Sequence, residues 1–213
     1  MLSILVANAK GGSGKTTLAT NLAGCFARRG EQVMLGDTDR QQSSRAWLGL
    51  RPDVLPAIRG WEIAPDAAAR PPHGTTHVVL DSPAGLHGHR LRELVRIVDR
   101  ILVPLQPSLF DMLATRAFLE VLMEEKPLRR GRARVGVVGM RVDERTRAAR
   151  ELERFLDAFG MPVVGYLRDT QLYVQVAAHG LTVFDLSPGR AGREIEQWRP
   201  ILDWLGAQPD SPV

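Results

Sequence analysis

A glycine-rich segment with two lysines, residues 10–17, contains the residues of this sequence best suited to chemistry. It reads Lys-Gly-Gly-Ser-Gly-Lys-Thr-Thr and lies between an apolar run at residues 2–7 and a stretch of helical periodicity at residues 18–29. Glycines let backbone N–H groups converge on phosphate oxygens, a lysine can reach the outer phosphates, and a threonine hydroxyl can ligate Mg²⁺. The segment therefore predicts a phosphate-binding loop, with Thr16 as a metal ligand. Its nucleotide-binding residues would be Gly11, Gly12, Ser13, Gly14, Lys15, Thr16 and Thr17.

Lysine is rare in this chain, which has 3 lysines and 25 arginines. Two of the three, Lys10 and Lys15, lie within this one loop. The planar fork of arginine is a poor substitute for a compact ammonium inside a tight phosphate cradle. We infer that the loop requires lysine at both positions. Ala9 stands where the usual G-x-x-x-x-G-K-[ST] pattern has its first glycine, so the loop departs from that pattern.

Aspartates follow two further apolar runs. Residues 32–36 lead into Asp37 and Asp39, and residues 76–80 lead into Asp81. Carboxylates at the C-terminal ends of strands in an α/β sheet lie where ligands bind. Asp81, about 65 residues after the loop, is placed like the aspartate that holds a Mg²⁺-bound water in phosphoryl-transfer enzymes. A second interpretation stays open for the acids after residue 36, as caps of the helix that follows.

Strands and helices are expected to alternate along the chain. The pattern predicts a single-domain α/β P-loop fold, with a mostly parallel twisted sheet and helices on both faces. We expect the domain to cover residues 1–207 and residues 208–213 to form a loose tail. The strands are expected at residues 2–7, 32–36, 61–64, 76–80, 101–105, 135–140 and 162–167, and the helices at 18–29, 41–50, 91–98, 111–123, 171–179 and 190–205.

Composition excludes several classes of protein. No apolar run approaches the length of a membrane span, and the N-terminus lacks a signal-peptide pattern, so we expect a cytoplasmic protein without a membrane partner. A single cysteine, Cys25, excludes an intramolecular disulfide and, with it, the cysteine cluster of an iron–sulfur carrier. His87 and His89 could form a metal pair, but no third ligand lies near them in the sequence.

Positive charge is concentrated in one part of the chain. The net charge is +4, yet residues 126–154 carry +6 and the remainder −2. Arginines on such a segment can bind DNA phosphates without reading the bases. Arg147 and Arg150 are therefore candidate DNA contacts, and the alternative is an ordinary solvated helix face.

The two-lysine loop resembles the deviant Walker A motif, KGGxGKT, of the ParA/MinD family of ATPases, and the chain looks closest to small plasmid-partition ParA proteins. Asp37, Asp39 and Gln41 match the family's D-x-D-P-Q segment, with Arg40 in place of the proline. The resemblance implies ATP and Mg²⁺ as cofactors and a homodimer that encloses ATP. It also implies that Lys10 reaches across the dimer to the partner's nucleotide.

The resemblance further implies roles for single residues. Lys15 would bind the phosphates of its own nucleotide, Asp39 would orient the attacking water or join the Mg²⁺ shell, and Asp81 would hold the metal. Arg141, after residues 135–140, would contact the adenine base. Lys10, Lys15 and Asp39 would thus be the catalytic residues.

The function implied is that of a slow, partner-stimulated ATPase. Its ATP-bound dimer would bind DNA non-specifically, associate with the nucleoid, and partition or position a plasmid, a chromosome region or a protein assembly. A cargo adaptor or stimulating protein is implied, without its identity. The main alternative is an ATP-dependent ligase of the dethiobiotin or cobyrinic acid synthase type, which would bind a small carboxylic acid and need no DNA.

Overall fold

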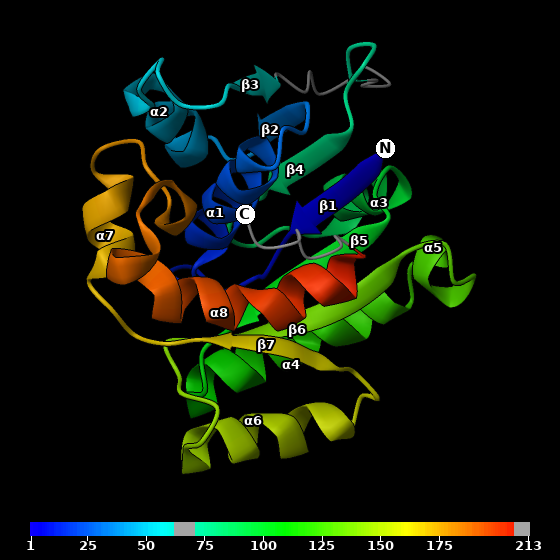
Figure 1. Cartoon of the computed structure of the whole chain (residues 1–213). Coiled ribbons are helices and arrows are strands. Elements are labelled where there is room, and N and C mark those ends of the chain that lie inside the picture. Colours follow the sequence, from blue (N-terminus) through cyan, green and yellow to red (C-terminus); the bar gives the residue numbers. More distant parts are fainter. Residues whose placement is uncertain (62–70, 207–213) are drawn as a thin grey trace.

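A seven-stranded sheet forms the centre of the protein, which we describe from a computed structural model over residues 1–61 and 71–206 (Figure 1). The strand order is β3-β2-β4-β1-β5-β6-β7, and every neighbouring pair is parallel. The predicted sheet is therefore confirmed. The strands are β1 (Leu2–Val6), β2 (Val33–Asp37), β3 (Ile58–Trp61), β4 (His77–Asp81), β5 (Arg100–Leu105), β6 (Arg134–Met140) and β7 (Val163–Leu167).

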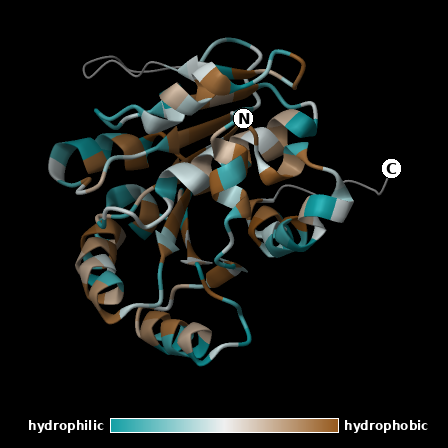
Figure 2. Ribbon diagram, turned by 90° about the vertical axis from the view of Figure 1, so that its left-hand side faces the viewer, coloured by the Kyte–Doolittle hydropathy of each residue, from teal (hydrophilic) through white to brown (hydrophobic). Residues whose placement is uncertain are grey.

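Helices cover both faces of this sheet, and the apolar core is accordingly divided into two layers (Figure 2). One layer lies under α1, α2, α7, the short 3₁₀ helix η1 and α8, and the other lies under α3, α4 and α6. The helices are α1 (Lys15–Arg28), α2 (Ser43–Leu50), α3 (Gly88–Arg96), α4 (Leu109–Met123), α5 (Lys126–Arg129), α6 (Arg147–Asp157), α7 (Leu172–Ala177), η1 (Val183–Asp185) and α8 (Pro188–Leu205).

The central strand β1 shows why the sequence folds in this way. Its Ile4 and Leu5 point to opposite faces and are both fully buried, one in each core layer. A strand covered on both faces reads as a continuous apolar run, which is what residues 2–7 display. The last helix, α8, contributes the fully buried Trp198 and packs against β7, as the apolar face of its sequence predicts.

Several predicted boundaries differ from the structure. β3 begins at Ile58 rather than at Trp61, and its predicted continuation over residues 62–64 lies outside the described residues, as does the tail 208–213. α1 begins at Lys15, because the glycine loop passes directly into the helix, so its first turn lies within the loop motif. The helices α5 and α6 and the 3₁₀ helix η1 were not among the predicted helices.

The parallel arrangement brings the C-terminal ends of all strands to one edge of the sheet. β1 lies between β4 and β5, at the position where the chain changes the direction in which it adds strands. Ligands of open α/β sheets bind at this position. Across the described ranges, no helix combines the length and apolar character needed to span a bilayer.

Candidate nucleotide-binding site

The glycine loop follows β1 and has a conformation that requires glycine. Gly12 and Gly14 have φ angles of +74° and +98°, which side-chain-bearing residues rarely adopt. A Cβ on Gly14 would also lie 2.7 Å from Cε of Met140, so the end of that side chain would have to move. Because α1 begins immediately afterwards, the unpaired N–H groups of its first turn are directed into the loop, as phosphate binding requires.

Neighbouring strand ends hold the loop in place. The Gln106 side chain, just after β5, donates from Nε2 to the Gly12 carbonyl oxygen at 2.9 Å. On the other side, the Gly85 N–H donates to the Ala9 carbonyl oxygen at 2.8 Å. These bonds join the loop to the segments after β5 and β4, so its shape is fixed by the sheet rather than by the loop alone.

The two lysines of the loop have different surroundings. Lys15 is buried, and its Nζ donates to the Lys10 carbonyl oxygen at 2.9 Å, which places the ammonium inside the loop. Burial lowers the pKa of Lys15, whereas the charges of Asp81 and Asp39 raise it. Lys10 itself is exposed at the surface. One lysine therefore lies in the cradle and the other is available outside it.

Asp81 and Thr16 form a pair at the ends of β4 and the loop. The Thr16 hydroxyl donates to Oδ2 of Asp81 at 2.8 Å, and Oδ1 of the same carboxyl is buried without a hydrogen-bond partner. Burial raises the pKa of Asp81 to about 7. A buried, unsatisfied carboxylate oxygen beside a hydroxyl suits a hard divalent cation such as Mg²⁺. When bound, that cation would neutralise negative charge on the carboxylate and on nucleotide phosphates.

The two aspartates after β2 have separate tasks. Asp37 caps α2, because its Oδ2 accepts from the Ser44 N–H at 2.9 Å, the Ser44 hydroxyl at 2.8 Å and the Arg45 N–H at 3.1 Å. Asp39 accepts the Gln41 N–H at 3.0 Å and lies close enough to Lys15 for its charge to raise the pKa of that lysine. The capping alternative thus applies to Asp37, and Asp39 stays in the loop beside the cradle.

A cavity of about 330 Å³ lies beside the glycine loop. It opens between the loop, the ends of β6 and β7, and α7, where a nucleoside attached to loop-bound phosphates would extend. Arg141 lines it and holds the left-handed conformation, with φ of +55°. The lining comprises Ser13, Gly14, Thr17, Met140, Arg141, Leu167, Arg168, Asp169, Thr170, Gln171, Tyr173, Val174 and Ala177.

Sequence reasoning missed the support of this cavity by α8. The Arg168 guanidinium donates from Nε to Oε1 of Glu194 at 2.8 Å and makes a second, shorter contact from Nη2, while the Arg168 N–H donates to the Gln197 side chain at 3.2 Å. Glu194 is 2% exposed although it lies on an otherwise amphipathic helix. A glutamate on the apolar side of that helix was the signal available in the sequence.

The remaining predicted residues lie away from this site. Arg147 and Arg150 are exposed on α6, and Arg147 pairs with Glu151 of the same helix at 2.8 Å. His87 contacts the Gly85 carbonyl oxygen, whereas His89 lies 3.4 Å from Glu93. Within the described parts of the chain, no group of three or more His, Cys, Asp or Glu residues could hold a metal.

Comparisons with known proteins agree with this geometry. Residues 4–183 match the family described as the CobQ/CobB/MinD/ParA nucleotide binding domain. The chain is 30% identical to the maintenance of carboxysome distribution protein A of Gloeobacter kilaueensis, over 95% of this chain and 93% of that protein. It is also 30% identical to the chromosome-partitioning ATPase Soj of Thermus thermophilus, over 75% of this chain and 78% of Soj.

Solved structures show the same fold at lower sequence identity. An ATP complex of a Cyanothece McdA variant superposes with a TM-score of 0.73 at 15% identity, covering 100% of this chain and 99% of that one. The MinC:MinD complex of Aquifex aeolicus gives 0.71 at 17% identity, with 100% and 98% covered. The chain therefore belongs to the CobQ/CobB/MinD/ParA family of nucleotide-binding domains and, within it, to the ParA/MinD family of deviant Walker A ATPases.

Proposed function

We propose that this protein is a positioning ATPase that dimerises around ATP and Mg²⁺, binds DNA non-specifically as that dimer, and distributes a cargo along the DNA. The observation that carries this proposal is the contrast between the two lysines of one loop. Lys15 lies inside the cradle, bonded to the Lys10 carbonyl oxygen, while the Lys10 residue is exposed. Among the described residues, no acidic side chain forms an ion pair with Lys10, so its charge is available to a second molecule.

Hydrolysis by such a dimer would depend on position and charge. Lys15 would stabilise the phosphates of its own nucleotide, Asp39 would orient the attacking water, and Thr16 with Asp81 would hold Mg²⁺. Lys10 would add a second ammonium to the partner's nucleotide, where negative charge develops. Removal of one such preorganised donor typically costs about 10²–10³-fold in kcat. The Arg141 side chain would contact the base in the cavity beside Gly14.

The relatives favour a positioning protein over a ligase. The description of the broader matching family includes CobQ and CobB, so the match to that family alone does not separate the two. The relatives that match nearly the whole chain are named for carboxysome distribution, and Soj is named for chromosome partitioning. A large protein assembly or a DNA region is therefore the proposed class of cargo, and a cargo adaptor that stimulates hydrolysis is the proposed partner.

The test compares Lys10→Ala with Lys126→Ala, which removes the same charge from a site away from the loop. We expect both variants to bind ATP, and only Lys10→Ala to stay monomeric with ATP in sedimentation velocity. Basal ATP hydrolysis should fall by about 10²-fold in Lys10→Ala alone. A Lys10→Ala variant that dimerises and hydrolyses ATP normally would contradict the proposed role of the dimer.

DNA co-sedimentation tests the second half of the proposal. The wild-type protein should bind a random-sequence duplex with ATP and bind it much more weakly with ADP. ATP binding without DNA association would contradict the DNA step. It would also favour the ligase, for which ATP turnover should then depend on an added small carboxylic acid.

A further inference from the structure

The structure divides the basic window of the sequence into two unequal parts. Residues 126–134 contain five basic side chains and no acid, which gives +5. The helix α6, by contrast, carries three arginines and three acids over residues 147–157 and is neutral. Nearly all of the +6 counted over residues 126–154 therefore belongs to α5 and the turn that leads into β6.

We define the end cluster as Lys126, Arg129, Arg130, Arg132 and Arg134, all of which are exposed. The backbone that carries these side chains is anchored in the protein. Pro127 and Ala133 are buried, and the N–H groups of Arg132 and Ala133 both donate to the Pro127 carbonyl oxygen, at 2.9 and 3.2 Å. The charges are thus presented on an ordered turn rather than on a free loop.

Two acids, Glu124 and Glu125, directly precede the end cluster, so residues 124–134 carry a net charge of +3. Among the described residues, its one ion pair joins Arg129 to Glu124 at 4.0 Å, and both side chains are largely exposed. Such a pair contributes little in water. Arg134 lies beside Arg100 of β5 in the sheet register, which adds a sixth positive charge. Arg100 has a buried Nε without a hydrogen-bond partner. Like charges directly opposite each other on neighbouring strands are unfavourable.

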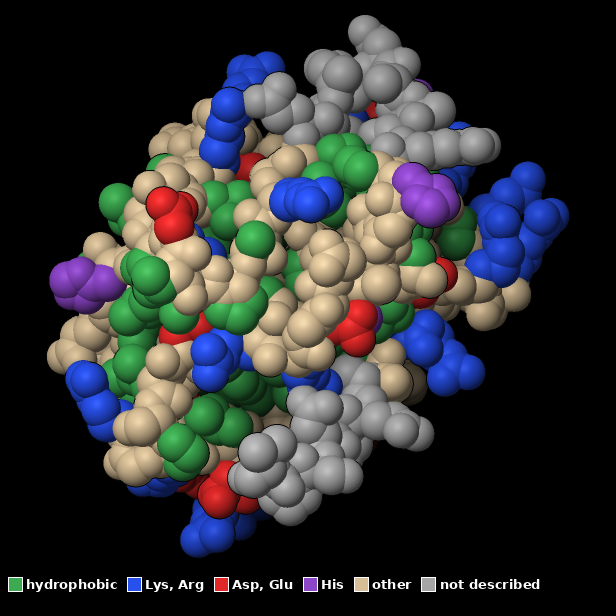
Figure 3. All heavy atoms as spheres, turned by 45° about the horizontal axis from the view of Figure 1, so that its top comes forward, with side chains coloured by type: hydrophobic (Ala, Val, Ile, Leu, Met, Phe, Trp, Pro, Cys, Tyr) green, Lys and Arg blue, Asp and Glu red, His purple; other side chains and the backbone are tan. Residues whose placement is uncertain are grey.

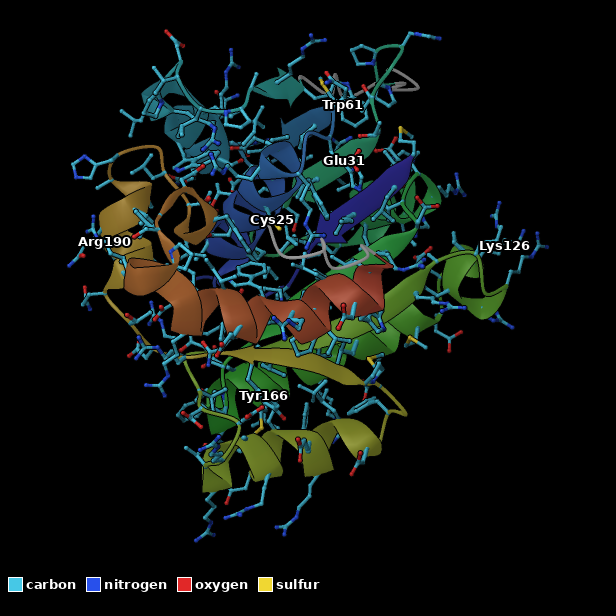
Figure 4. All side chains as sticks on the ribbon, viewed as in Figure 1. Cys25, Glu31, Trp61, Lys126, Tyr166 and Arg190 are labelled. Atoms are coloured by element: carbon cyan, nitrogen blue, oxygen red, sulfur yellow. The ribbon has the colours of Figure 1, made fainter. Side chains whose placement is uncertain are left out.

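The end cluster lies at the opposite end of the sheet from the nucleotide site. β6 starts at Arg134, in the cluster, and ends at Met140, which contacts the glycine loop. Seven strand residues span roughly 20 Å. Figures 1 and 4 show α5 and the labelled Lys126 projecting at one end of the molecule, and Figure 3 shows a group of Lys and Arg side chains at the same end.

We propose that the end cluster, rather than α6, is the main surface that binds the DNA phosphate backbone. The proposal rests on the DNA binding proposed above and assigns a place to it. Guanidinium groups pair with phosphate oxygens through two parallel hydrogen bonds and need no contact with the bases. A set of arginines that keeps a net positive charge of +3 with its two flanking acids, on an ordered turn, fits a duplex of any sequence. The arginines of α6 are accompanied by acids on their own helix and contribute less.

The test compares the double variant Arg130→Gln/Arg132→Gln with the matched α6 variant Arg147→Gln/Arg150→Gln. Both remove two exposed charges, and neither touches the nucleotide site. The dissociation constant for a random-sequence duplex is measured with ATP at several salt concentrations. Loss of two phosphate contacts should flatten the slope of log K against log salt by about 1.8. We expect this change and weaker binding in the end-cluster variant, and a much smaller change in the α6 variant.

Unchanged ATP hydrolysis and an unchanged thermal midpoint would show that either variant is folded. Normal DNA binding by the end-cluster variant, with a loss in the α6 variant, would overturn the inference and leave the proposed DNA binding intact. Equal losses in both variants would also overturn it, because the α6 surface would then contribute as much. A wild-type protein that binds no DNA with ATP at low salt would overturn the inference together with the DNA step of the proposed function.

Discussion

The buried carboxyl of Asp81 makes the stability of the nucleotide-free protein depend on pH in an unusual direction. Burial raises its pKa from 3.8 to about 7, so the folded state holds a proton that the unfolded state releases. Stability therefore falls as the pH rises from about 4 to 7 and is constant above that range. Most aspartates have the opposite effect, because partners in the folded state lower their pKa.

The size of the effect follows from the two pKa values. A difference of about 3 units at about 1.4 kcal/mol per unit corresponds to a cost of about 4 kcal/mol above pH 7. Asp81→Asn removes this cost, because the amide does not ionise, while Oδ1 of the amide can still accept the Thr16 hydroxyl. The amide NH₂ would take the place of the unpartnered oxygen, which adds a penalty of about 1–3 kcal/mol that is independent of pH.

Urea unfolding of both proteins between pH 4 and 8, without nucleotide or Mg²⁺, measures this difference. The free energy of unfolding of Asp81→Asn relative to wild type should increase by about 3–4 kcal/mol between pH 4 and pH 8. Addition of ATP and Mg²⁺ at pH 8 should then stabilise the wild type far more than the variant. A difference that stays flat across this pH range would refute a protonated Asp81 in the folded state.

Two further predictions concern the walls of the site. In thermal unfolding, Gly14→Ala should destabilise the fold by about 1–2 kcal/mol and weaken ATP binding, because its φ of +98° is strained for any residue with a Cβ. The control is Gly192→Ala on α8, where an added Cβ would meet open space. It should instead stabilise the fold by about 0.5–1 kcal/mol in the same thermal unfolding assay. Glu194→Ala should lower the free energy of unfolding by about 2 kcal/mol and weaken ATP binding, since Arg168 loses its buried acceptor. Glu194→Gln should recover part of both changes, and calorimetry measures them.

The sequence predicted the sheet and the phosphate loop because both depend on local signals. Apolar runs such as residues 2–7 form strands buried on both faces. A glycine-rich turn before a helix is sufficient to indicate the phosphate cradle. Asp81, which follows the apolar run at residues 76–80, could be placed beside Thr16 because parallel strands end at one edge of the sheet. None of these features required side-chain detail.

Long-range contacts were not predictable in the same way. Asp37 and Asp39 are two residues apart, at the end of β2 and just after it. Which of them caps α2 is decided by the hydrogen bonds that Asp37 accepts from the first turn of that helix. The Arg168–Glu194 pair joins residues 26 apart in the chain across β7 and α8. The charged window is divided in space, because the strand β6 separates its two basic parts although they adjoin in sequence.

The position of the end cluster explains how ATP could control DNA binding without a change of shape inside each protomer. The end cluster lies at the start of β6, and Met140 at the other end of that strand lies beside the glycine loop, so the cluster is outside the candidate nucleotide site. In the proposed dimer, however, ATP joins two protomers through the Lys10 loop, and the dimer then carries two end clusters. The two end clusters would face away from the seam between the protomers, so each could bind its own segment of a long DNA. The second segment then binds intramolecularly, which raises the avidity of the dimer above that of a single protomer. In the proposed function, the ATP site that would join the protomers and the basic surface that would bind DNA thus lie at opposite ends of the same sheet.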